Sequence, residues 1–262
     1  MAKAVLGTLP GHLFGLTLSN NASDATNDID IAAGQASDRA AGGLMVLAAG
    51  LTKQLDATWS AGSAAGGRFA TSISDATWHV FLISNGTTVD VGFSTNLDPT
   101  SDPSYPSGYT LYRRIGSIVR ASSAIRAFKQ LGDRFVWDTM AADYAAGDPG
   151  TSAYSIALTV PSGLVLMADF NAFLIDTNVT GSSDIFVRFS ALDQPNNTPS
   201  NADFSLVVGE TNADSDSVAY VAPLSIKTNT SRQIRARLSA SRASLTLRIV
   251  TTGWTDRRGR DA

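Results

Sequence analysis

Residues that could bind a metal or act as catalytic acids and bases are few in this sequence. It contains no cysteine, two histidines (His12 and His79) and one glutamate, Glu210, beside 22 aspartates. A zinc site is normally built from several Cys, His and carboxylate ligands, so two histidines without cysteine would depend on carboxylates. His79 lies between Trp78 and Val80 in a run typical of a strand. We therefore interpret both histidines as hydrogen-bonded structural residues.

The sequence also lacks the short motifs of several enzyme classes. It contains no Gly-x-Ser-x-Gly elbow, no Gly-x-Gly-x-x-Gly turn and no Walker loop. A glycosidase needs two carboxylates with separated pKa values across a cleft, whereas the aspartates here stand mostly in turn contexts. Asn212, Asp214 and Asp216 have the alternate spacing of a calcium loop without its later Gly and Glu, which favours a polar hairpin tip. The sequence thus predicts a protein that is not an enzyme, with no catalytic residue, no cofactor and no bound metal.

Three aromatic residues could contact a carbohydrate. Trp59, Tyr105 and Tyr109 lie in or beside long loops, where the face of an aromatic ring could stack on a sugar ring. The other three tryptophans lie in strand-like runs and are expected in the core. Glycan contact by Trp59, Tyr105 and Tyr109 is a hypothesis that follows from their placement.

Basic residues gather in two segments, each of which closes one half of the chain. Residues 109–137 contain six basic residues against one aspartate, and residues 232–260 contain eight arginines, in a chain of net charge −3. A basic stripe can bind nucleic acid. This layout instead favours ion pairs with Asp-rich loops of the same or a neighbouring subunit, so we expect no nucleic-acid partner. The candidates for subunit contacts are Arg113, Arg114, Arg235, Arg237, Arg257 and Arg258.

Alternating apolar residues and the strong preference for Asp over Glu predict an all-β chain. Residues 78–84 and 89–94 flank Asn85-Gly86, which predicts a hairpin. Residues 44–55 are expected to form a second pair of strands joined at Ala49-Gly50.

Three further segments have specific expectations. Residues 59–69 are rich in Gly, Ser and Ala and are predicted to be a mobile loop. Residues 109–137 are predicted to form a dense antiparallel meander in which Gly116 resets the strand register. In residues 232–238, apolar side chains alternate with arginines, which predicts a strand with one buried face and one basic face.

The chain is predicted to form two antiparallel β-domains of the sandwich or jelly-roll type. Residues 1–14 would be an N-terminal anchoring arm, residues 15–138 the first domain and residues 139–262 the second. The small, polar stretch 138–150 is expected to be the linker between them. No run of 18 apolar residues occurs, so no membrane span is expected, and glycines and a proline interrupt any signal-peptide core at the start.

Three blocks of the sequence resemble a known group of proteins. GLTLSNNASDATNDIDIAAG (15–34), YTLYRRIGSIVR with the following GDRFVW (109–137), and NTSRQIRARLS with GWTDRRGR (229–260) are similar to proteins of tailed bacteriophages and prophages of Gram-negative hosts. Most of those proteins are described only as hypothetical. In them, similar blocks form free-standing proteins or the C-terminal part of tail-fibre-like proteins. The resemblance carries over no catalytic residue.

This resemblance implies a structural protein of the virion tail, in a fibre, tail tip or baseplate, that takes part in host-surface adhesion. The implied partners are other virion proteins, further copies of the chain in a homotrimer, and a host-surface polysaccharide. Loops near 59–69, 95–108 and 193–203 would face the host, and the N-terminal arm would attach to the particle. The alternatives are a capsid decoration or head-fibre protein, a lectin-like carbohydrate-binding module and, less favoured, a polysaccharide depolymerase.

Overall fold

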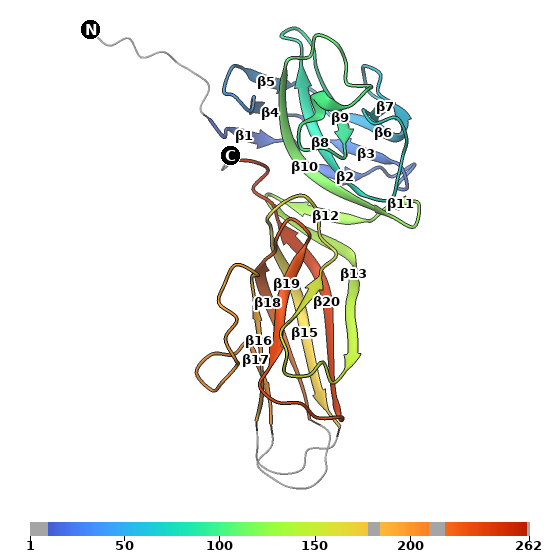
Figure 1. Cartoon of the computed structure of the whole chain (residues 1–262). Helices are drawn as coiled ribbons and strands as arrows, with labels where there is room; N and C mark the ends of the chain where they lie inside the picture. Colours follow the sequence, from blue (N-terminus) through green and yellow to red (C-terminus); the bar gives the residue numbers. More distant parts are fainter. Residues whose placement is uncertain (1–9, 178–183, 210–217, 261–262) are drawn as a thin grey trace, which may run out of the picture. The chain divides into compact units, whose positions relative to one another are not determined.

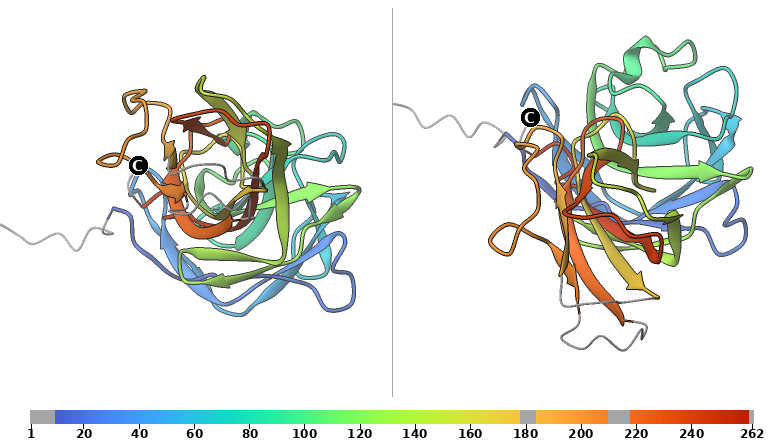
Figure 2. Two further views of the ribbon diagram at one scale, coloured as in Figure 1. Left: turned by 90° about the horizontal axis from the view of Figure 1, so that it is seen from below. Right: turned by 60° about the horizontal axis from the view of Figure 1, so that its bottom comes forward.

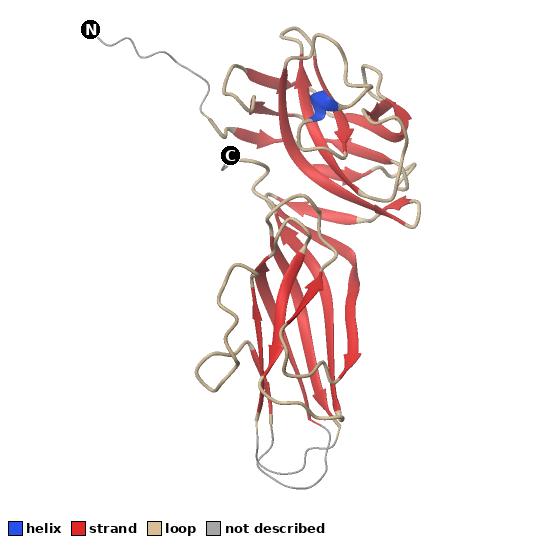
Figure 3. Cartoon of the chain, in the orientation of Figure 1, coloured by secondary structure: helices blue, strands red, loops and turns tan. Residues whose placement is uncertain are grey.

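The structure, a computed structural model, describes residues 10–177, 184–209 and 218–260. Its regular structure is almost entirely β, as expected, and one short 3-10 helix, η1 (Pro99–Ser101), is found among these residues (Figure 3). The described residues divide into two compact units, residues 10–138 with 256–260, and residues 139–255. The last residues of the described chain therefore belong to the first unit, whereas the sequence assigned them to the second domain.

The first unit contains a three-stranded sheet in the order β1-β4-β5 and an eight-stranded sheet in the order β11-β10-β8-β9-β7-β6-β3-β2 (Figure 1). Its strands are β1 (Leu13–Gly15), β2 (Leu18–Asn20), β3 (Asp28–Ile31), β4 (Gly34–Ser37), β5 (Leu44–Leu47), β6 (Leu51–Thr58), β7 (Ala65–Arg68), β8 (Thr77–Ser84), β9 (Val89–Ser94), β10 (Leu111–Ala121), β11 (Ala124–Ile125) and β12 (Phe128–Leu131). Its pairs are antiparallel except β6 with β7 and β7 with β9.

The eight-stranded sheet curls until its two ends approach each other. The backbone N–H of Ile125, in β11 at one end, donates to the carbonyl of Thr26, in the turn after β2, at 2.8 Å. Beside β2, the side chain of Gln130 in β12 accepts a hydrogen bond from the N–H of Leu18 at 2.7 Å. This sheet is thus nearly closed and barrel-like, which removes most of the unpaired backbone that an open edge would expose.

Two local predictions for the first unit are confirmed. The pair β8–β9 is a hairpin, with Ser84 opposite Val89 across the Asn-Gly turn. In β10, the register against β8 shifts between Arg114 and Gly116, so the glycine follows a bulge. The bulge lets both Ile115 and Gly116 be buried in succession.

Two predicted strand pairings are wrong. β5 and β6 do not pair with each other, because β5 pairs with β4 and β6 pairs with β3, where Leu51 lies opposite Ile31. Residues 109–137 do not form one meander: β10 and β11 belong to the eight-stranded sheet, whereas β12 pairs with β13 (Arg134–Gly147). The short hairpins β10–β11 and β12–β13 do form, the second around the predicted turn at residues 131–133, but they belong to different sheets.

The glycine-rich segment 59–69 is also not simply a loop. It contains β7, which lies between β6 and β9. A Cβ atom at Gly67 would lie 2.6 Å from the ring of Phe93 and 3.1 Å from the Cβ of Lys53. Only a residue without a side chain fits there, so the glycine content reflects close packing in a sheet and not a mobile loop.

The second unit is a sandwich of two sheets (Figure 2). One sheet has the order β13-β20-β15-β18 within this unit, and the other has the order β14-β19-β16-β17. The strands are β14 (Tyr154–Ala157), β15 (Met167–Asp176), β16 (Ile185–Ser190), β17 (Leu206–Val208), β18 (Val218–Lys227), β19 (Gln233–Leu238) and β20 (Leu245–Thr255). Inward-facing apolar side chains of the two sheets form its core, where the rings of Phe170 and Phe189 meet edge to face at 5.5 Å.

The predicted linker 138–150 is wrong, because β13 is one continuous strand of 14 residues through residue 147. The small residues there were interpreted as a linker, but the strand continues through them and lies beside β20. The division between the two units falls within this strand, at residues 138 and 139. The predicted N-terminal arm lies in part outside the described residues, in 1–9. Its last residues form β1, in which Phe14 lies opposite Gln35 of β4. The predicted calcium-like spacing at Asn212, Asp214 and Asp216 lies outside the described residues.

Candidate functional site

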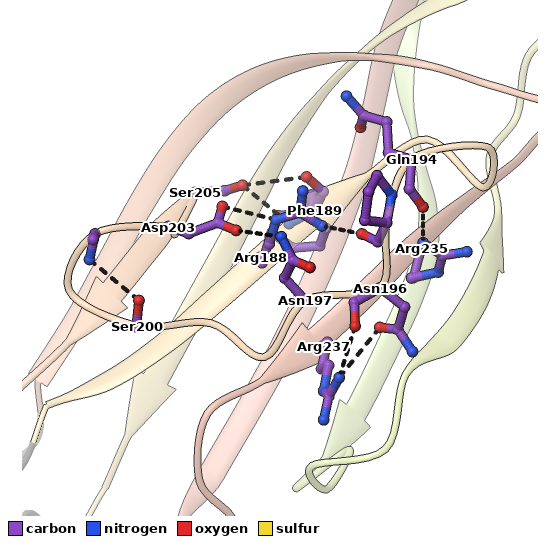
Figure 4. Close-up of polar contacts among 12 residues, drawn as sticks. Arg188, Phe189, Gln194, Asn196, Asn197, Ser200, Asp203, Ser205, Arg235 and Arg237 are labelled. Atoms are coloured by element: carbon purple, nitrogen blue, oxygen red, sulfur yellow. Dashed lines mark hydrogen bonds and ion pairs between the residues drawn. The ribbon is translucent and has the colours of Figure 1, made fainter.

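The outer face of the sheet β14-β19-β16-β17 carries three arginines (Figure 4). In β19, Ile234, Ala236 and Leu238 are buried, which turns Arg235 and Arg237 to the other face. The same alternation in β16 turns Arg188 outward. The alternation that predicted a basic face for residues 232–238 is therefore confirmed.

Strand register brings these arginines together. Arg188 lies directly opposite Arg237, and Ser190 lies opposite Arg235. Two like charges directly across an antiparallel pair destabilise it unless they are compensated. The compensation comes from the loop 191–203, which follows β16 and returns over this face.

Among the described residues, Arg188 is the one arginine of the three that forms an ion pair on this face. Its Nε donates to Oδ1 of Asp203 at 2.8 Å, and its Nη1 donates to the carbonyl of Pro195 at 2.9 Å. The amide of Asn197 donates to Oδ2 of Asp203 at 3.2 Å. The hydrogen bond from Arg188 and then that from Asn197 hold the pKa of Asp203 below its usual value. Asp203 is therefore a carboxylate at neutral pH.

Arg235 and Arg237 bind the loop through neutral groups. Arg235 donates from Nη1 to the carbonyl of Gln194 at 2.7 Å and from Nη2 to the carbonyl of Leu192 at 2.8 Å. Arg237 donates from Nη1 to the carbonyl of Asn196 at 3.1 Å and from Nε to that of Thr151 at 3.2 Å. Carbonyl oxygens satisfy donors without cancelling charge, so the face keeps three guanidinium groups against one carboxylate.

The loop is also stabilised by contacts within itself. The side chain of Gln194 accepts a hydrogen bond from the N–H of Ala191 at 3.0 Å, and Ser200 and Asp203 pair through their backbones. Beside it, the ring of Phe204 is 45% exposed and packs on Phe186 with 5.2 Å between centroids. The loop therefore presents its side-chain amides next to the guanidinium groups of the sheet and the ring of Phe204, and hydrogen bonds hold it in place.

A pocket of about 460 Å³ opens at the first residues of this loop. Leu192 and Asp193 line it on one side, and Lys227, Asn229 and Thr230 line it on the other. Lys227 donates to Asp193 at 2.5 Å, and this bond lowers the pKa of Asp193. The lining of the pocket is mostly apolar, and none of the three arginines belongs to it.

The three aromatic residues predicted to contact glycan lie in the first unit and do come together. The ring centroids of Trp59 and Tyr109 are 5.4 Å apart, and Phe69 lies 5.0 Å from Tyr105. Trp59 donates to the carbonyl of Val91 at 3.1 Å, and the Tyr105 hydroxyl donates to the carbonyl of Tyr109 at 2.9 Å. Burial raises the pKa of Tyr105 and Tyr109. The structure thus gives these residues a packing role, and their glycan contact stays a prediction.

The arginines predicted to contact another subunit are mostly engaged within the chain. In the first unit, Arg114 forms a two-pronged ion pair with Asp256, at 2.5 and 2.7 Å, and Arg113 donates to the carbonyl of Gly259 at 2.7 Å. Arg258 lies 3.3 Å from Asp133. Burial by itself would raise the pKa of Asp256, but its bonds and charge contact with Arg114 hold it below the usual value.

These ion pairs attach residues 256–260 to the first unit. In the second unit, Arg235 and Arg237 are hydrogen-bonded within the chain. Of the six predicted residues, Arg257 is the one that is exposed. The expectation that arginines pair with aspartates of the same chain is confirmed for Arg114 and Arg258. A subunit contact by any of the six arginines stays a prediction.

Both histidines are hydrogen-bonded, as predicted. Nδ1 of His79 lies 2.8 Å from Oγ of Ser117, which also accepts a hydrogen bond from Arg114 at 3.2 Å. Burial, and then the charge of Arg114, lower the pKa of His79 to about 4. His12 lies 2.9 Å from the side-chain amide of Gln35. A serine and a histidine in contact could suggest a nucleophile, but both are buried here.

Lys53 and Asp90 form a buried ion pair in the first unit, at 2.9 Å, which no pattern in the sequence predicted. Each residue stands in an alternating run at a position that the structure turns inward. No group of three or more metal-binding side chains occurs within the described ranges, and no helix in them is long and apolar enough to cross a membrane.

Comparisons with known proteins add little to this description. No protein-family model matches the chain, and no curated protein matches it. Among solved structures, a chain of infectious bursal disease virus, Gx strain, is similar at 14% identity with a TM-score of 0.18. The match covers 92% of this chain and 64% of that one, so this chain spans less than two thirds of the viral chain. A TM-score of this size does not establish a shared fold.

Proposed function

We propose that this chain is a non-enzymatic structural protein of a virion, in a tail fibre or tail tip, that adheres to the surface of a host cell through its second unit. The observation that carries the proposal is the loop 191–203. Arg188, Arg235 and Arg237 donate to its backbone carbonyls from a rigid sheet. A loop that is already ordered loses little conformational entropy on binding, which is how sandwich folds present recognition loops.

The side chains at this loop suit a surface made of sugars. Gln194, Asn196 and Asn197 are exposed amides, and Phe204 presents a ring beside them. Amides and guanidinium groups hydrogen-bond to hydroxyls, while an aromatic face packs on a sugar ring. Such contacts are individually weak, so a trimer that engages several sites at once would supply the avidity. The blocks that resemble phage tail proteins support the same proposal.

The direct test is adhesion to cells followed by location on the particle. Fluorescently labelled protein should bind Gram-negative cells of the right host and, in excess, should compete with the phage for adsorption. Gold-labelled antibody against the chain should mark the tail. Label on the head would favour a capsid decoration protein, and absence of binding to every host tested, even on a multivalent bead, would overturn the adhesion proposal.

Assembly has its own measurement. Light scattering at micromolar concentration should give about three times the mass of the 27.4 kDa chain. A monomer would contradict the trimer and would leave multivalency to the rest of the particle.

A further inference from the structure

We infer that the arginine face of the second unit binds a carboxylate group of an acidic polysaccharide, with Arg237 and Arg235 as the anion contacts. This inference rests on the proposed adhesion and names the ligand chemistry of the same site. Its first support is the imbalance of charge. Arg188 is paired with Asp203, whereas Arg235 and Arg237 donate to carbonyl oxygens alone among the described residues.

The second support is the geometry of Arg237. Its Nε and Nη1 are occupied, but no described residue accepts a hydrogen bond from its Nη2. The planar guanidinium group fixes the direction of the two Nη2 N–H groups, each of which can donate a charge-assisted hydrogen bond to a carboxylate oxygen. Holding a loop in place explains the bonds that are made, but it does not require the unused donors or the opposition of Arg188 and Arg237.

The third support concerns the kind of polymer. Among the described residues, the face carries one carboxylate, that of Asp203, and Asp193 lies in the adjoining pocket; residues 137–230 of the sequence contain eleven acidic residues against two basic ones. A nucleic acid carries a charge at every phosphate and would meet these carboxylates along its length. A polysaccharide with one acid group in each repeat can place its carboxylate on Arg237 while neutral sugars lie against Asn196, Asn197 and Phe204. The charge pattern therefore favours a sparsely charged glycan.

The test starts from surface polysaccharide extracted from cells that the protein binds. Its carboxyl groups are reduced to alcohols with carbodiimide and borohydride in one portion, and phosphate groups are removed in another. The full-length protein should bind the native and dephosphorylated material alike and should bind the carboxyl-reduced material about 10-fold more weakly or worse, since a hydrogen-bonded ion contact is lost. Equal binding to native and reduced polysaccharide overturns the inference, and loss on dephosphorylation alone assigns the anion to phosphate and overturns the carboxylate.

Matched variants locate the contact. Arg237→Gln should weaken binding about 10-fold, whereas Arg248→Gln removes the same charge from an exposed position on the other sheet and should change binding less than about 2-fold. Equal effects of the two variants would overturn the assignment to this face. If Arg237→Gln unfolds, Arg237→Lys keeps the charge without the fork and should still lose affinity. Wild-type protein that binds no cells refutes the proposed function itself, whereas cell binding that survives carboxyl reduction refutes only the ligand.

Discussion

Replacement of Lys53 by Met should destabilise the first unit by about 3–5 kcal/mol, because it leaves a buried carboxylate without its counter-ion. Lys53 stands on β6 and Asp90 on β9, with β7 between them. The Lys53 ammonium lies 2.9 Å from Asp90 and donates to the carbonyls of Ser60 at 2.7 Å and Gly66 at 3.5 Å. The two side chains are 0% and 2% exposed, so water cannot replace what the substitution removes.

The size of this effect follows from what Asp90 retains. In the variant its carboxylate still accepts from the N–H of Val91 at 2.6 Å and of Gly62 at 2.8 Å, but among the described residues it has no other ion-pair partner. Burial already lowers the pKa of Lys53, while the hydrogen bond and charge of Asp90 oppose that shift. In the pair, the attraction between the two charges offsets the cost of burying them. Removal of Lys53 takes away the attraction and leaves the cost of burying the Asp90 carboxylate. A loss of this size is a large part of the stability of an ordinary domain.

The measurement is urea unfolding followed by tryptophan fluorescence, since Trp59 lies 5.3 Å from the Lys53 ammonium and reports on this site. The matched control is Lys129→Met, whose ion pair with Asp138 is long, at 3.4 Å, and mostly exposed, and which should cost less than about 1 kcal/mol. Asp90→Asn in addition to Lys53→Met should recover part of the loss, because it removes the unpaired charge. If Lys53→Met costs no more than Lys129→Met, the claim that the pair is fully desolvated is wrong.

Three further predictions concern buried titratable groups. Because the pKa of His79 is lowered to about 4, the folded state binds fewer protons than the unfolded one; stability should fall by about 3 kcal/mol as pH drops from about 6.5 to 4, and His79→Phe should remove this dependence in thermal unfolding. Burial, followed by the charges of nearby aspartates, raises the pKa of Asp28 to about 6, so the folded state holds an extra proton and loses stability as pH rises from about 4 to 6; Asp28→Asn should be more stable than wild type at pH 8 and equal to it at pH 4. Asp256→Asn should cost about 3–5 kcal/mol in urea unfolding by leaving Arg114 without its carboxylate, and a cost below about 1 kcal/mol would show that residues 256–260 are not held by this pair.

Local patterns predicted much of the strand content but little of the pairing. The Asn-Gly pair at residues 85–86 predicted its hairpin because a short turn, here residues 85–88, fixes register within a few residues. Residues 44–55 offered an equally short connection, yet β5 and β6 joined different sheets. β6 pairs instead with β3, where Leu51 lies opposite Ile31, and no local pattern encodes a partner twenty residues away. The same limit explains why β7 was missed, since its glycines are explained by Phe93 and Lys53 and not by their neighbours in sequence.

For the candidate site, the sequence by itself determined that Arg235 and Arg237 share a polar face, because side chains alternate along any strand with one buried face. Only the tertiary structure decided what these arginines do. It set Arg188 opposite Arg237, folded the loop 191–203 onto them, and joined Arg114 to Asp256 across 142 residues of chain. Periodicity is a property of neighbouring residues, whereas the partner of a charge depends on which distant segments share a core, and that is settled by packing of the whole unit.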